Sequence, residues 1–178
     1  MLTRREAIVL LWMQTHLGAA EVIGAISILE RTQKLPATHI QLHAAAWIAY
    51  KAYTTCASDK YSFFADHVLH GMQKCSGVAE EEMDMLQAIQ FYVPSKTRAD
   101  AVYELGCPHL KRQELDVGIT LALLMPELCN SMTDEQYTRC VLFAAAYKAG
   151  KVVRALATKD VSKDFIMQWG LRIARQTE

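Results

Sequence analysis

The sequence has no excess of charge of either sign, and this absence excludes the simplest class of nucleic-acid-binding protein. Its 178 residues include 19 Lys and Arg and 19 Asp and Glu, which gives a formal net charge of +0 at pH 7. Modules that bind duplex DNA through its phosphates need a basic surface, which a neutral composition does not predict. We therefore expect no nucleic-acid partner.

Other absences exclude further classes of protein. No apolar run approaches the roughly 18 residues that cross a membrane. The apolar run that follows Arg4-Arg5 is short and is interrupted by Gln14 and His16, so we expect no secretory signal. The chain contains five cysteines and no Cys-x-x-Cys pair, which predicts reduced thiols in the nucleus or cytoplasm and no membrane partner. The scattered cysteines are Cys56, Cys75, Cys107, Cys129 and Cys140.

Candidate sites for chemistry are weak. His39 and His43 are spaced i, i+4, and His67 and His70 are spaced i, i+3, but neither pair has the further ligands of a zinc tetrad beside it. Cys107 with a histidine nearby does not specify a nucleophile, and the 8 glycines form no phosphate-binding loop. We expect no metal, no cofactor, no small-molecule ligand and no enzymatic activity.

Helix signals dominate the sequence, and strand signals are nearly absent. Hydrophobic residues make up 52% and charged residues 21%, a balance that favours a folded chain. Thr3, Thr38 and Thr133 are each followed three residues later by Glu or Gln, the spacing of a capping box at a helix start. The pattern predicts an all-α protein. Besides a helix after Thr3, we expect helices over residues 19–33, 40–53, 60–74, 79–90, 98–105, 110–129, 133–152 and 162–175.

The second half of the chain resembles the first. Each half has an Ala-rich helix that follows a Thr capping box and ends in Ala-Tyr-Lys-Ala, at residues 49–52 and 146–149. The central Ala-rich helix at 40–53 is apolar nearly all round, which predicts a buried position in a bundle. We therefore predict two helical domains, 1–94 and 95–178, with the second divergent or shortened.

Four segments of the first half match the helices of a cyclin box. Residues 7–13, Ala-Ile-Val-Leu-Leu-Trp-Met, fit the apolar frame of its first helix, and residues 29–32, Leu-Glu-Arg-Thr, stand where its second helix ends. Residues 49–54, Ala-Tyr-Lys-Ala-Tyr-Thr, keep the lysine of the third helix without the acidic pair that follows it. Residues 82–91, Glu-Met-Asp-Met-Leu-Gln-Ala-Ile-Gln-Phe, reproduce the fifth helix without a gap. The chain thus resembles a short, divergent member of the cyclin family.

This resemblance implies two tandem cyclin-like bundles and a role as a regulatory subunit that binds and activates a cyclin-dependent protein kinase. It implies that Lys51 and Glu82 hydrogen-bond backbone groups of the kinase near its regulatory helix, while Leu86, Phe91 and Ala52 contribute to the apolar contact around them. Docking of this kind favours the active conformation of the kinase.

Two further expectations come from the same resemblance. Glu30 is expected to form an internal ion pair with Arg5, or with Arg4 in its place. Ile8 and Trp12 lie where cyclins form a docking patch for substrates. We expect this patch to be altered, because Arg5 stands near its start.

Other interpretations of the same residues stay open. Lys51 is also consistent with an ordinary surface lysine at a helix end, with its hydrocarbon part buried and its ammonium in water. Glu82 belongs to a run of acidic residues of the kind favoured in the first turn of a helix. The alternative function is a cyclin-fold scaffold or adaptor in transcription complexes without direct kinase activation.

Overall fold

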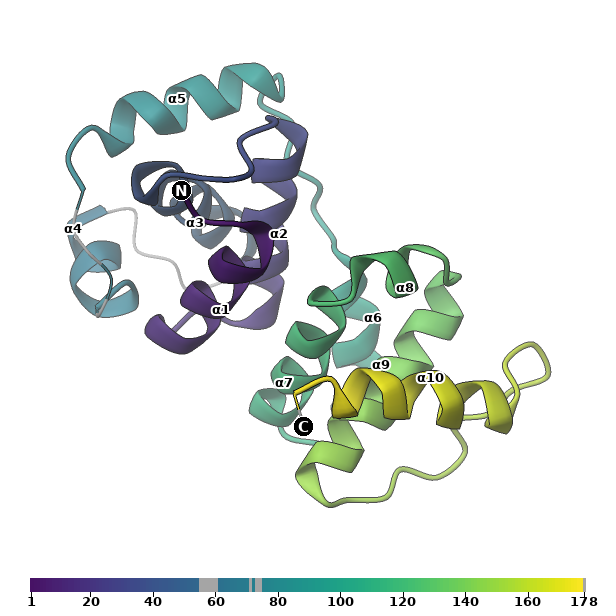
Figure 1. The fold of residues 1–178 in the computed structure, drawn as a ribbon. Helices are drawn as coiled ribbons and strands as arrows, with labels where there is room; N and C mark the ends of the chain where they lie inside the picture. Colours follow the sequence, from purple (N-terminus) through teal and green to yellow (C-terminus); the bar gives the residue numbers. More distant parts are fainter. Residues whose placement is uncertain (55–60, 71, 73–74, 178) are drawn as a thin grey trace. The chain divides into compact units, whose positions relative to one another are not determined.

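The computed structural model describes residues 1–54, 61–70, 72 and 75–177. All regular elements in this part of the chain are helices, as the sequence predicts for an all-α protein. The chain divides into two compact units, Met1–Ser95 and Lys96–Glu178, and Figure 1 shows the segment that connects them after α5. The sequence places the domain boundary after residue 94.

The helices of the first unit begin where the capping signals predict. Thr3 and Thr38 both form complete capping boxes; Thr38 Oγ1 accepts from the backbone N–H of Gln41 at 3.2 Å, and the Gln41 side chain accepts from the Thr38 N–H at 2.9 Å. These bonds satisfy N–H groups that lack partners within the helix. The elements are α1 (Arg4–Gln14), α2 (Ala19–Arg31), α3 (His39–Tyr53), α4 (Tyr61–Phe63), a π-helical turn (Phe64–Val68) and α5 (Val78–Ala88).

Helix α3 is the centre of the first unit (Figure 1). Every residue from Leu42 to Tyr50 is buried, and α3 packs against both α2 and α5. A helix with no polar face is stable only when neighbours cover it on all sides. The prediction that this Ala-rich helix is buried is confirmed.

The helix expected over residues 60–74 is confirmed over Tyr61–Val68, although most of it is π-helical, and it ends earlier than expected. Helical turns at Tyr61–Phe63 pass into the π-helical turn Phe64–Val68, and Leu69 and His70 follow as a bend and a turn. Phe64 is fully buried and lies 5.0 Å between ring centroids from both Trp47 and Tyr50. This packing favours the wider turn, because it directs Phe64 into the core. Residues 60, 71 and 73–74 of the expected helix, and Cys56, lie outside the described residues.

The second unit has α9 at its centre. Thr133 forms the predicted capping box with Gln136, and α9 packs against α6, α7 and α10. Val141, Leu142, Ala144 and Ala145 of α9 are fully buried. The elements are α6 (Arg98–Gly106), α7 (Arg112–Leu123), α8 (Pro126–Asn130), α9 (Asp134–Ala149) and α10 (Lys163–Arg175).

Two expected helices of this unit were too long. The helix predicted over 110–129 is divided into α7 and α8, because Pro126 has no N–H to donate and disfavours helical geometry at Met125, which has φ −123° and ψ 64°. The helix predicted over 133–152 ends at Ala149. Gly150 follows with φ 66°, a left-handed conformation that is typical of a residue closing a helix.

Candidate protein-binding surface

Helices α3 and α5 are joined by an ion pair between Lys51 and Glu82. Lys51 lies in the last turn of α3, and its Nζ contacts Glu82 Oε1. The same ammonium lies 4.7 Å from the centroid of the Trp47 ring. The side chains of Lys51 and Glu82 are 37% and 16% exposed, so the pair lies at the protein surface. Two contacts to one ammonium restrict where the Lys51 side chain lies.

Leu86 and Phe91, two further residues of the expected contact, lie in and just after the last part of α5. The N–H of Phe91 donates to the Leu86 carbonyl at 2.7 Å and that of Gln90 donates to the Gln87 carbonyl at 3.0 Å, which is the Schellman pattern of a helix end. Gln90 and Phe91 both have positive φ, at 55° and 58°. Phe91 is 61% exposed, and Leu86 is half-buried one helical turn after Glu82.

We call Lys51, Ala52, Glu82, Leu86 and Phe91 the Lys51 surface. The ion pair, the turn spacing on α5 and the backbone bond to Leu86 connect four of these residues, and Ala52 is exposed next to Lys51. A charged pair beside exposed apolar side chains is typical of protein-binding surfaces, whose anchors are often aromatic. The structure joins Lys51 to Glu82 and places Leu86 one turn further along α5, with Phe91 exposed just after the end of that helix.

A second ion-pair cluster on α5 was not found from the sequence. Lys34 Nζ lies 2.8 Å from Asp84 Oδ2 and 3.0 Å from Glu81 Oε1, and these two carboxylates raise the pKa of Lys34. The Schellman pattern at the end of α2 positions the lysine, since its N–H donates to the Leu29 carbonyl at 2.9 Å. No periodicity links residue 34 to residues fifty positions away, so only the fold shows this contact.

Three expectations for the first two helices need comment. Arg4 Nε lies 2.7 Å from Glu30 Oε1. Glu30 therefore pairs with Arg4, and the expectation that it pairs with Arg5 is wrong. Ile8 is fully buried and cannot form a substrate-docking patch, because its side chain belongs to the core. Trp12 is half-buried.

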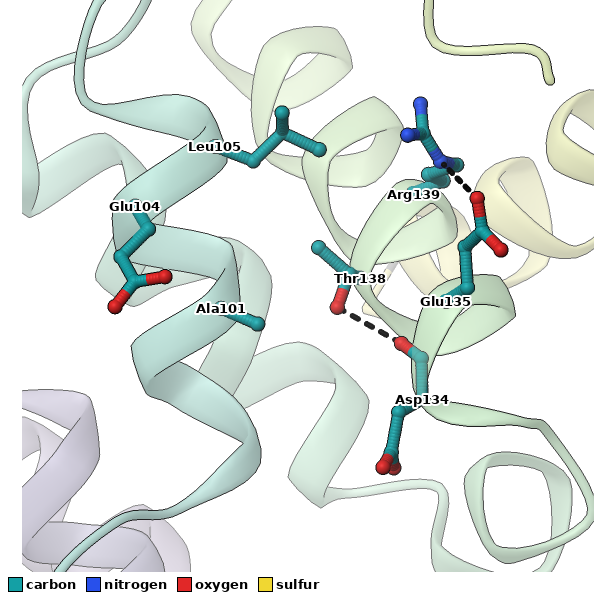
Figure 2. A pocket seen from close by; sticks show the side chains of 7 residues that line it. All are labelled: Ala101, Glu104, Leu105, Asp134, Glu135, Thr138 and Arg139. Atoms are coloured by element: carbon teal, nitrogen blue, oxygen red, sulfur yellow. Dashed lines mark hydrogen bonds and ion pairs between the residues drawn. The ribbon is translucent and has the colours of Figure 1, made fainter.

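In the second unit, a groove lies between α6 and α9 (Figure 2). Ala101 and Leu105 point from α6 toward α9, and the groove has a volume of about 410 Å³. On α9, Arg139 Nε lies 3.3 Å from Glu135 Oε1, and the Thr138 hydroxyl donates to the Asp134 carbonyl at 2.8 Å. Two of the charged side chains that line it, Arg139 and Glu135, are therefore paired with each other.

Arg98, at the start of α6, is a further residue that sequence reasoning missed. It donates to the carbonyls of Cys129 and Met132, both at 2.8 Å, and to Asp134 Oδ1 at 2.9 Å. Its guanidinium also lies 4.7 Å from the Tyr137 ring centroid. These contacts join α6 to the turn between α8 and α9, so Arg98 has a structural role.

The histidine and cysteine residues form no recognisable reactive site in the described part of the chain. No group of three or more His, Cys, Asp or Glu side chains there could hold a metal ion. Cys75, Cys107, Cys129 and Cys140 are free thiols, and burial raises the pKa of Cys140 to about 12. A thiol with so high a pKa is a poor nucleophile at neutral pH.

His43 gives the first unit a predicted pH dependence. It is 2% exposed, neither ring nitrogen has a hydrogen-bond partner among the described residues, and burial, with a smaller effect of His39, lowers its pKa below the ordinary 6.5. Below pH 6.5 the unfolded chain then binds more protons than the folded one. The free energy of unfolding should therefore decrease as the pH is lowered below 6.5, by up to about 1.4 kcal/mol per pH unit.

Urea unfolding at about pH 7.5 and about pH 5.5 measures this loss, because carboxylates titrate mainly at lower pH. The His43→Leu variant should lose less stability between the two conditions than the wild type. The exposed neighbour gives the control, since His39→Gln should keep most of the wild-type loss. Equal losses in the wild type and His43→Leu would contradict the prediction.

The comparisons with known proteins do not assign the chain to a family. Set against protein-family models, curated proteins and solved structures, the sequence and fold show no significant match. Among the described helices, none combines the length and the apolar character that a membrane crossing requires.

Proposed function

We propose that this protein is a cyclin-type regulatory subunit that binds and activates a cyclin-dependent protein kinase. The observation that carries the proposal is the ion pair between Lys51 of α3 and Glu82 of α5, with Phe91 exposed just after the end of α5. These residues are among those that the cyclin resemblance marks for kinase contact. The proposed role is regulatory, with the chemistry done by the kinase.

The chemistry of the pair suits recognition of a backbone. Helix ends and the loops before them present N–H and C=O groups without intrahelical partners. The Glu82 carboxylate can accept from such N–H groups and the Lys51 ammonium can donate to carbonyls, whatever side chains the partner carries. Phe91 and Leu86 would bury apolar area around the polar contacts.

The similar arrangement of helices within each unit supports tandem cyclin-like bundles as part of this proposal. Each unit has a central Ala-rich helix, α3 or α9, that starts at a Thr capping box and ends near a Tyr-Lys-Ala sequence. In the first unit α3 packs against α2 and α5, and in the second unit α9 packs against α7 and α10. The second unit inserts the short helix α8 and is the more divergent copy in this interpretation.

Substitutions in the ion pair test the proposal. We expect Glu82→Ala to weaken kinase binding by at least about 2 kcal/mol, roughly thirtyfold, because it removes a charged acceptor from the centre of the contact. Lys51→Ala should weaken binding in the same direction. A pull-down against a panel of purified cyclin-dependent kinases, followed by a kinase assay of each complex, measures both effects.

The matched control is Lys34→Ala with Asp84→Ala, which removes another ion pair to α5 but leaves the Lys51 surface unchanged. It should bind and activate the kinase as the wild type does. If Glu82→Ala folds normally, judged by circular dichroism, and still binds as tightly as the wild type, the Lys51 surface is not the kinase contact. Kinase binding without activation would favour the scaffold function instead.

A further inference from the structure

The second unit contains an apolar cavity that the proposed kinase contact does not use. It has a volume of about 390 Å³ and lies between α9, the connection that follows it and the first half of α10. Phe143 lines it from α9, and Ile166 and Met167 line it from α10. Figure 1 shows the connection between α9 and α10 as a long segment without helix. Sites for small molecules commonly have volumes of about 300–1,000 Å³.

Both charged residues that line the cavity are cationic. Its lining residues are apolar except Arg154, in the connection, and Lys163, at the start of α10. Neither forms an ion pair with any described residue, whereas Lys151, close by in the sequence, is held 2.8 Å from Glu114. Asp160 and Asp164 are near in the sequence but do not line the cavity.

An apolar wall with two cationic side chains fits an amphiphilic anion. The apolar side chains would cover a hydrocarbon chain, at a gain of roughly 25 cal/mol for each Å² removed from water. The guanidinium and ammonium groups would bind the anionic end through charge-assisted hydrogen bonds. A cationic head would be repelled by the same two side chains.

We propose that this cavity binds a free carboxylate with an apolar chain, with Arg154 and Lys163 holding the carboxylate. This proposal differs from the expectation, made from the sequence alone, that the protein binds no small-molecule ligand. The site lies wholly within the second unit and does not depend on the Lys51 surface.

Isothermal titration calorimetry of the full chain with sodium dodecanoate, below its micelle concentration, tests the proposal. We expect saturable binding at one site. The Arg154→Gln, Lys163→Gln double variant should bind dodecanoate about tenfold more weakly or worse, because both charged donors are lost. Met167→Glu, which places a carboxylate at a partly exposed position of the wall, should also weaken binding.

Three controls make the result specific. Lys96→Gln with Lys159→Gln removes the same charge from residues that do not line the cavity, and should bind dodecanoate as the wild type does. Dodecyltrimethylammonium, with the same chain and the opposite charge, should bind the wild type no more tightly than the cavity double variant. Circular dichroism establishes that each variant is folded.

The proposal is overturned if dodecanoate shows no saturable binding, or if the cavity double variant binds it with wild-type affinity. Equal binding of the cationic amphiphile would also overturn it, since the cavity would then recognise only the chain. Sedimentation of the free protein gives a further outcome. Self-association that Met167→Glu abolishes would assign the cavity to a second copy of the chain instead.

Discussion

Phe64→Ala is expected to destabilise the first unit by about 3–5 kcal/mol, the usual cost of removing a fully buried aromatic side chain. Phe64 has no exposed surface, and its ring contacts those of Trp47, Tyr50 and Tyr61, at centroid distances of 5.0, 5.0 and 5.9 Å. The cavity left behind would lie between α3 and the π-helical turn, where three rings lose their shared neighbour. Urea unfolding followed by circular dichroism measures the loss.

The preceding residue provides a matched control. Phe63 is 44% exposed and stacks on His67 at a centroid distance of 4.5 Å. Because nearly half of Phe63 already faces water, Phe63→Ala should cost much less than Phe64→Ala. Similar losses for the two variants would contradict the position of Phe64 in the core.

Gly118→Val is expected to destabilise the second unit by about 3 kcal/mol, near the upper end of the usual cost of overpacking. A Cβ atom at Gly118 would lie 2.7 Å from Ala145 Cβ and 2.9 Å from the Val141 carbonyl oxygen, so α7 and α9 would have to separate. The oxygen belongs to the backbone of the central helix and cannot rotate away as a side chain could. The shift of the urea midpoint measures the effect.

Gln113→Val on the same helix is the control for the helix propensity of valine. Gln113 is exposed, so its replacement should change the free energy of unfolding by less than about 0.5 kcal/mol. If Gly118→Val were as well tolerated, α7 and α9 would not be in close contact at this position.

The contacts between helices could be predicted from the sequence only in part. The cyclin resemblance selected Lys51 and Glu82 for contact with a partner, and the structure places these two side chains in an ion pair with each other. The contacts of Lys34 and Arg98 were not predictable, because each reaches carboxylates or carbonyls from residues more than thirty positions away. The cavity beside α10 was missed although its residues all lie between positions 143 and 167, because only the fold shows that they surround one space.

The sequence by itself determined where most helices begin. Thr3, Thr38 and Thr133 bond to residues three positions along the chain, and such local bonds do not depend on the rest of the fold. The Ala-rich composition of α3 likewise determined that it is buried, because a helix without a polar face has no side to present to water.

Only the tertiary structure decided which residues meet across helices. It placed Arg4 rather than Arg5 against Glu30, buried Ile8, and turned the chain at Phe64 so that the ring enters the core. These outcomes depend on the rotation and separation of packed helices, which single-residue shifts in register can change. Local sequence patterns fix the helices, while side-chain packing between distant segments fixes the surfaces that they form.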